Sequence, residues 1–160
     1  GTPLSVFVKN TLEAESMSAD NLELEITESI LMKDTELAIR TLSELTKLGV
    51  TLAIDDFGTG YSSLSYLKKF PLNVLKIDKS FVNDVTRDPD DAAIIGAILA
   101  MSHHLQLDVV AEGIETKEQL EFLQKHHCQR GQGFYFSKPL NFTDFSILVE
   151  SYLEPGIQMS

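Results

Sequence analysis

Short apolar runs alternate with amphipathic stretches along the 160 residues of the chain. Runs with a two-residue period predict five strands, over residues 22–27, 51–55, 73–78, 108–112 and 131–136. Three- and four-residue periods predict helices between them, which begin near residues 4, 34, 88, 116 and 143. Strands separated by helices need crossover connections, so we expect an α/β fold with a mainly parallel sheet.

The helix ends carry their own signals. Asp34 is placed to cap a helix that Gly49 ends, and Asp88 precedes a proline at the start of the next. Thr116 and Gln119 have the spacing of a capping box. These signals separate helix from strand where the apolar pattern alone is ambiguous.

The predicted strands are two-faced, and this is the most informative feature of the sequence. In the first four, one face is apolar and the other ends in a charged residue near the carboxyl end. An antiparallel sheet with one solvated face would also alternate, but the helical connections argue against it. In a barrel of parallel strands these groups would meet at the mouth where such enzymes place their chemistry. The set comprises Glu25, Glu28, Asp55, Asp56, Lys76, Asp78, Glu112, Glu115 and Gln132.

Carboxylates dominate that set. Like charges in one cleft repel, so either their pKa values rise or cations bind between them. Oxygen ligands favour hard ions, so we expect Mg²⁺ or Mn²⁺, and two such ions can clamp a phosphodiester and activate water. Lys76 could add positive charge beside a developing oxyanion. The residues therefore predict metal-assisted hydrolysis of an anionic substrate.

Asp55 and Asp56 are neighbours, and regular alternation would point them to opposite faces. We expect the chain to bend directly after Asp55, with the bend supplied by the four residues that follow the pair. These are Phe57, Gly58, Thr59 and Gly60.

Composition limits the kinds of partner that the chain is expected to bind. A net charge of −11 argues against nucleic-acid polymers and anionic lipid surfaces. No apolar run is long enough for a membrane span, and no secretory signal opens the chain. The single Cys128 fits a reducing cytoplasm. The four histidines fall in two adjacent pairs near helix ends and predict surface or packing roles.

Five motifs, in order along nearly the whole chain, resemble the EAL family of bacterial cyclic di-GMP phosphodiesterases. They are LELEITES at 22–29, DDFGTGYSSL at 55–64, LKID at 75–78, VVAEGIET at 109–116 and QGF at 132–134. The resemblance implies a TIM-like (β/α) barrel and metal-dependent hydrolysis of cyclic di-GMP to the linear dinucleotide pGpG.

The resemblance also implies roles for matching residues. Glu25, Asp55 and Asp56 would ligate two metal ions, and Glu115 would support them. Glu112 would be the general base, and Lys76 would lie near the catalytic water. Asp78, Gln132 and Phe134 would face the substrate. Glu28 would anchor the loop of residues 57–63, including Phe57, Gly58, Thr59 and Gly60, which in the family couples the site to dimer contacts.

The chain departs from the family by lacking the Glu-Ala-Leu signature and the Val-Asn-x-Ser strand, each of which supplies a metal ligand. We therefore expect one partial domain over residues 1–160, with about five of eight β/α units, and little or no activity alone. Open strand edges would favour a homodimer or self-association. We expect a longer parent with sensor or diguanylate-cyclase domains.

Two other functions remain open. A non-catalytic receptor for cyclic di-GMP would bind without turnover. An aldolase would use Lys76 as a Schiff-base nucleophile, which needs a lowered lysine pKa. So many neighbouring acids should instead keep that lysine protonated.

Overall fold

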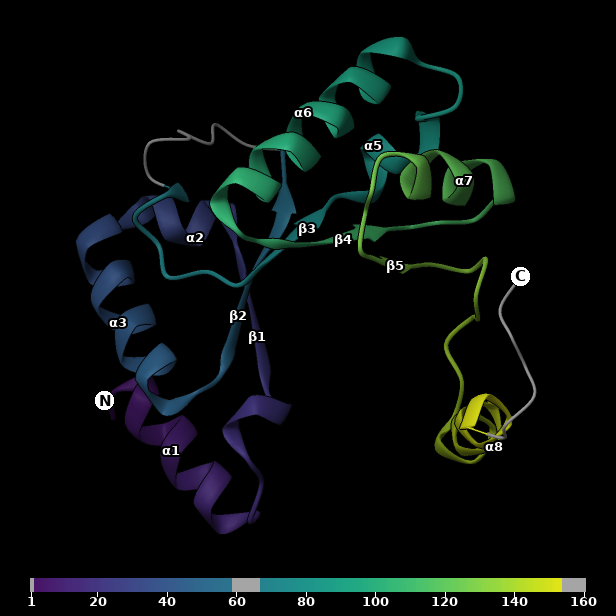
Figure 1. Cartoon of the computed structure of the whole chain (residues 1–160). Coiled ribbons are helices and arrows are strands. Elements are labelled where there is room, and N and C mark those ends of the chain that lie inside the picture. The colour runs from purple at the N-terminus through teal and green to yellow at the C-terminus, as the bar shows by residue number, and fades with distance from the viewer. Residues whose placement is uncertain (1, 59–66, 154–160) are drawn as a thin grey trace.

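The computed structural model describes residues 2–58 and 67–153, in which helices alternate with the strands of one sheet (Figure 1). The elements are α1 (Leu4–Ala14), the 3₁₀ turn η1 (Ala19–Asn21), β1 (Glu23–Thr27), α2 (Glu28–Lys33), α3 (Thr35–Leu48), β2 (Thr51–Phe57), β3 (Val74–Ile77), α5 (Lys79–Asp84), α6 (Pro89–Leu105), β4 (Asp108–Glu112), α7 (Lys117–Lys125), β5 (Arg130–Gln132) and α8 (Phe142–Leu153).

The five strands are parallel and lie in chain order, β1-β2-β3-β4-β5, so the expected α/β class and parallel sheet are confirmed. The register sets Lys76 opposite Val110, and Glu112 opposite Gln132. Because all strands run the same way, their carboxyl ends share one edge of the sheet.

Helix ends follow the sequence signals. The side chain of Asp34 accepts a hydrogen bond from the Leu37 N–H, and Gly49 ends α3 in the left-handed conformation at φ 95°. Asp88 caps α6 ahead of its first-turn proline. Thr116 and Gln119 form the predicted capping box of α7.

The sequence misjudged three local elements. β5 ends at Gln132, and residues 134–136 form a turn, so the predicted strand over 131–136 was wrong beyond its first two residues. Instead of pairing further, the Tyr135 N–H donates to the Ile114 carbonyl and the Phe136 N–H to the Gly133 carbonyl. The short helices α2 and α5 were not predicted, because six residues are too few to show a helical period.

The two faces of the sheet pack differently. One face is buried under the helices in the main core, which includes Leu52, Leu75 and Val109. Among the described residues, the buried apolar side chains of the other face form a small separate cluster of Ala53, Val74 and Val110. The hydrophobic effect therefore seats the helices on one side and leaves the other for polar groups.

An ion pair across the polar face reveals the curvature of the sheet. Arg130 of β5 lies 3.8 Å from Glu23 of β1, although these are the outermost strands, and 3.4 Å from Asp108 of β4. Two edge strands can approach each other in this way only if the sheet curls towards that face, as the wall of a barrel does.

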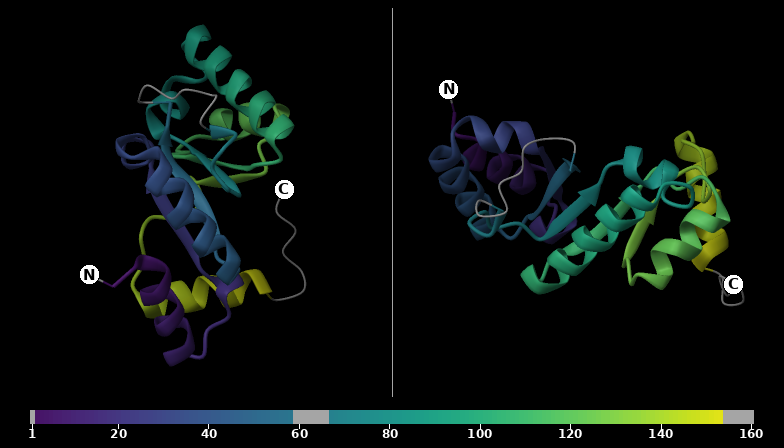
Figure 2. Two further views of the ribbon diagram at one scale, coloured as in Figure 1. Left: turned by 90° about the vertical axis from the view of Figure 1, so that its left-hand side faces the viewer. Right: turned by 90° about the horizontal axis from the view of Figure 1, so that it is seen from above.

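Helix α8 lies apart from the other helices. The right-hand view of Figure 2 shows it on the opposite side of the molecule from α1 and α3, which pack together. Several of its apolar side chains are exposed, with Phe142 85% accessible. No helix in residues 2–58 and 67–153 combines the length and the apolar character that crossing a bilayer requires.

Two glycines give a matched prediction about packing. A Cβ on Gly133 would lie 2.0 Å from the Ile114 carbonyl oxygen, whereas one on Gly96, inside α6, would meet nothing within 4 Å. We expect Gly133→Ala to lower the free energy of unfolding by about 1–3 kcal/mol through overpacking. Gly96→Ala should raise it by about 0.5–1 kcal/mol through helix propensity. Urea denaturation measures both, and equal effects of the two variants would contradict this packing.

Candidate functional site

A buried lysine on the central strand organises the polar face. Lys76 is 6% exposed. Its Nζ atom lies 2.6 Å from Glu25 Oε1, 2.7 Å from Glu112 Oε1 and 3.4 Å from Asp55 Oδ1. These acids come from β1, β4 and β2, so one ammonium group ties together the carboxyl ends of four strands.

Burial alone would lower the pKa of Lys76 because it disfavours the charged form. Hydrogen bonds to Glu112 and Glu25, with the charges of Glu112 and Asp55, outweigh burial and raise that pKa above its ordinary value. The lysine is therefore a permanent cation at neutral pH. A Schiff-base nucleophile needs the opposite shift, which removes the aldolase interpretation.

A bulge brings Asp55 and Asp56 to the same side. Ile54 pairs with Leu75 and Phe57 with Ile77, so β2 has one residue more than β3 over this stretch. Asp56 absorbs the irregularity with φ 54°, in the left-handed region that aspartate tolerates better than most residues. The prediction that the chain bends after Asp55 and so brings both acids together was right. The predicted origin of the bend in the residues from Phe57 onward was wrong, because Asp56 itself supplies the bend and β2 continues to Phe57.

The pKa values of Asp56 and Asp78 are shifted in opposite directions. Burial and the charges of Asp55 and Asp78 raise its pKa, and Lys76 only partly opposes them. The pKa of Asp78 is lowered even though burial would raise it, because the Ser80 hydroxyl and backbone N–H donate to its carboxylate. Asp78 thereby caps α5.

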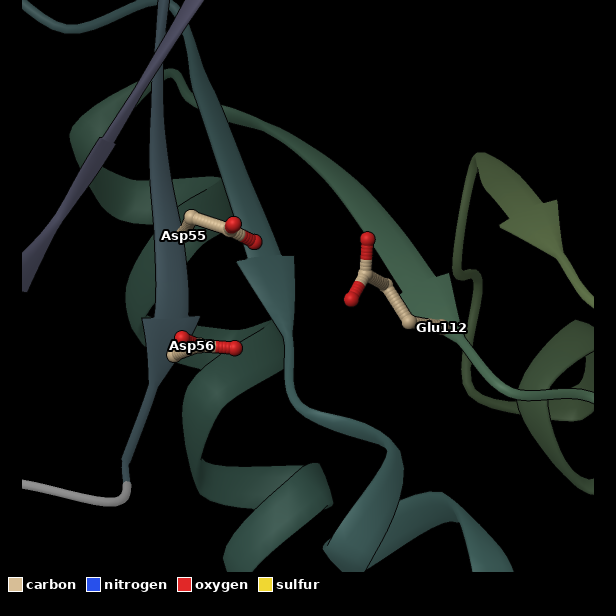
Figure 3. Close-up of side chains that lie close together, drawn as sticks. All are labelled: Asp55, Asp56 and Glu112. Atoms are coloured by element: carbon tan, nitrogen blue, oxygen red, sulfur yellow. The ribbon is translucent and has the colours of Figure 1, made fainter.

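Three carboxylates are already close enough to share a cation. Asp55, Asp56 and Glu112 each offer an oxygen within 4.8 Å of the others (Figure 3). Asp55 Oδ1 is buried and, among the described residues, accepts no hydrogen bond, although Lys76 lies at ion-pair distance. An orphaned carboxylate oxygen in an all-oxygen cluster suits a hard divalent ion such as Mg²⁺ or Mn²⁺.

The other predicted site residues lie around this cluster. Glu25 is half-exposed and reaches the cluster through Lys76. Gln132 ends β5 beside Glu112 in the register. Glu115 is exposed and does not belong to the three-acid group. Phe134 is 56% exposed in the turn after β5.

The predicted loop residues divide between described and undescribed parts of the chain. Glu28 opens α2 with its side chain buried, and its Oε2 has no hydrogen-bond partner among the described residues. Phe57 is buried, and Gly58 has φ 100° with no room for a side chain against the Phe81 ring. Thr59 and Gly60 lie outside the described residues.

Sequence reasoning missed two supports for Glu112. Gly113 has φ 73°, and a Cβ there would lie 2.5 Å from Lys79 Cβ. Gln119 is buried, and its Oε1 accepts from the backbone N–H groups of Glu115 and Thr116. The capping box was visible in the sequence, but its second function of bracing the loop after Glu112 depends on the backbone path.

Comparison with known proteins identifies relatives of this arrangement. The family model of the EAL domain matches residues 5–139. The cyclic di-GMP phosphodiesterase NbdA of Pseudomonas aeruginosa is 47% identical over 145 residues, which are 91% of this chain and 18% of NbdA. The signaling protein YkoW of Bacillus subtilis is 48% identical over 133 residues, 83% of this chain and 17% of YkoW. The chain thus spans about a fifth of these relatives.

Solved structures agree with the sequence relatives. The PaMucR phosphodiesterase in complex with c-di-GMP superposes with a TM-score of 0.86 at 44% identity, over 90% of this chain and 58% of that one. The manganese/cy-diGMP complex of Klebsiella pneumoniae BlrP1 gives 0.79 at 34% identity, over 84% of this chain and 34% of that one. The chain therefore spans just over half of the first of these solved chains and about a third of the second.

The raised pKa of Asp56 generates a prediction on stability. Since the folded state holds the proton more tightly than the unfolded chain, this group favours folding most below the unfolded pKa, and its contribution falls as pH rises through the folded pKa. Asp56→Asn, which tolerates the same φ, should therefore raise the Tm of the metal-free chain at neutral pH and change it little near pH 3. Thermal unfolding by circular dichroism measures this.

Added Mg²⁺ should raise the Tm of the unsubstituted chain and have little effect on Asp56→Asn. The exposed Asp20→Asn in η1 serves as the control, with Mg²⁺ stabilisation intact. A Mg²⁺ response unchanged in Asp56→Asn would rule out Asp56 as a ligand.

Removing the central cation should cost stability. We expect Lys76→Met to lower the free energy of unfolding by about 1–3 kcal/mol at neutral pH, because three carboxylates then face one another unpaired. The loss should shrink near pH 4, where carboxylates become protonated. The exposed Lys47→Met should change it by less than about 0.5 kcal/mol. A pH-independent loss would show that packing rather than charge is responsible.

Proposed function

Because the chain belongs to the EAL domain family, we propose that it forms the metal-binding wall of a phosphodiesterase that hydrolyses cyclic di-GMP to pGpG. The observation that carries the proposal is the convergence of Asp55, Asp56 and Glu112 beside the buried Lys76. NbdA, whose name states this activity, supports it at 47% identity. We propose that the whole chain is part of one such domain.

The metal centre in this proposal holds two Mg²⁺ or Mn²⁺ ions. Glu25, Asp55 and Asp56 would be ligands, and Glu115 would support them from the loop after β4. Bound divalent ions would supply an activated water and offset the charge of the phosphodiester. The all-oxygen donor set supports hard ions, as does the manganese named for BlrP1.

Glu112 would act as the general base. It lies at the end of β4, 20% exposed, with one oxygen held 2.7 Å from Lys76 Nζ. That contact orients the carboxylate, so that its other oxygen can accept the proton of an attacking water. Lys76, as a permanent cation, would stabilise negative charge that develops on the phosphate oxygens.

The substrate would lie across the carboxyl ends of the strands. Asp78 and Gln132 follow β3 and end β5, and would contact the dinucleotide from either side of Glu112. The half-exposed ring of Phe134 would stack on a guanine base. Glu28, with its buried unpartnered oxygen, would anchor the loop that begins at Phe57 and Gly58 and includes Thr59 and Gly60.

We propose that the parent protein is a larger bacterial signalling protein acting in the cytoplasm, with sensor or diguanylate-cyclase domains beside this one. The name of the bifunctional diguanylate cyclase/phosphodiesterase MucR, 47% identical over 133 residues, supports such an arrangement. The open edges at β1 and β5 and the uncovered apolar residues of α8 support a homodimer or self-association.

A chimera tests the activity directly. We would replace the matching segment of the PaMucR phosphodiesterase, 58% of that chain, with this chain, so that the rest of the PaMucR chain supplies the other strands. The chimera should hydrolyse cyclic di-GMP in the presence of Mn²⁺ and lose activity with a chelator. Glu112→Gln should lower kcat by about 10²–10⁴-fold, the usual share of general base catalysis.

The surface variant Glu121→Gln, in a helix ion pair with Lys117, should leave kcat unchanged. The 160-residue chain alone should turn over little or no substrate, because its sheet supplies only part of the barrel. Binding of cyclic di-GMP without turnover by the chimera would favour a receptor, and undiminished activity of the isolated chain would contradict the partial-site proposal.

A further inference from the structure

All four histidines of the chain line one hollow, far from the acidic cluster. The hollow measures about 500 Å³ and lies between the second half of α6 and the end of α7. His103 and His104 come from the last turn of α6, and His126 and His127 follow α7. The sequence predicted only surface or packing roles for these two pairs, because their common location depends on how the helices pack.

Two of the imidazoles are held in a form that can bind a metal. His104 Nδ1 lies 2.8 Å from the Ala100 carbonyl oxygen, and His126 Nδ1 lies 2.8 Å from that of Phe122. A carbonyl can only accept, so Nδ1 carries the proton in each ring and Nε2 keeps a free lone pair. Metal-ligating histidines commonly show this arrangement, with the second ring nitrogen bonded to a carbonyl.

The position of the hollow favours a positive ion. It lies at the carboxyl ends of α6 and α7, where the helix dipoles concentrate negative partial charge. His126 is further fixed by stacking on Phe122, with ring centroids 4.1 Å apart. The absence of a side chain at Gly96 keeps the α6 wall open, since a Cβ there would meet nothing within 4 Å.

We propose that this hollow binds a borderline divalent transition-metal ion, such as Ni²⁺, Zn²⁺ or Cu²⁺, through Nε2 of His104 and His126. His103 and His127 complete the ligand set. Imidazole nitrogen suits these ions and is a poor donor for Mg²⁺, so the acidic cluster and the hollow select different metals.

Binding requires the rings to reorient. Among the described residues, only the acidic cluster has three or more candidate ligands already within 4.8 Å of one another. His103 and His127 are exposed, so their side chains can rotate towards the rings of His104 and His126. The ion would join the end of α6 to the end of α7, and these lead into β4 and β5.

The test is calorimetric titration of the full chain, free of any histidine tag, with Ni²⁺ in a large excess of Mg²⁺ that occupies the acidic cluster. We expect about one equivalent to bind, and His104→Ala/His126→Ala to weaken binding by at least about tenfold. Thermal unfolding should show a Ni²⁺-dependent rise in Tm that this double variant loses. Circular dichroism without metal verifies that the variant is folded.

Lys125 provides the matched control because its side chain also lines the hollow. Lys125→Ala should leave Ni²⁺ binding intact or tighten it, since it removes a competing positive charge. The visible spectrum of the Co²⁺ complex should report nitrogen ligation and change in the double variant. Absence of Ni²⁺ binding in excess Mg²⁺, or equal affinity in the double variant and the unsubstituted chain, would overturn the proposal.

Discussion

The site depends on one ammonium group held between the carboxylates of three neighbouring strands. A lysine as buried as Lys76 would be strongly disfavoured alone, and its three acids would repel one another without it. These ion pairs hold the carboxyl ends of β1, β2 and β4 around β3. Asp56 lies beside them, so one ammonium group faces four carboxylates. The excess negative charge at the mouth of the sheet favours the binding of further cations.

Much of this arrangement was predictable because it follows from the two-residue period of the strands and from the order of strands and helices along the chain. Alternation in four strands correctly predicted the polar face and the gathering of Asp55, Lys76 and Glu112 at one edge, whereas Asp56 was expected there only through a bend of the chain. The bulge at Asp56 was not predictable in detail, because it depends on a register shift between partners. The turn at Phe134 was missed for a similar reason: Gly133 packs against the backbone of Ile114, which no local pattern reveals.

The fold separates two kinds of donor atoms between its two ends. The strands carry oxygen donors to their carboxyl ends, and the helices carry nitrogen donors to theirs. In a parallel α/β sheet these ends lie on opposite sides, because each helix runs back before the next strand begins. The family match covers residues 5–139 and so includes both ends, but the motif residues that gather in the structure, Asp55, Asp56, Lys76 and Glu112, lie at the oxygen-rich end. The histidine hollow follows instead from α6 and α7, whose ends come together only in the folded chain.

The bulge in β2 also sets the direction of Phe57. If the strand alternated regularly through Asp56, Phe57 would point to the polar face; the bulge returns the ring to the helix-packed core, where it is buried. The bulge therefore places two carboxylates on the polar face ahead of an inward-facing ring. Loss of the Asp56 codon would leave a regular strand with that ring still in the interior, so the mouth would lose one carboxylate while the packing of Phe57 was kept.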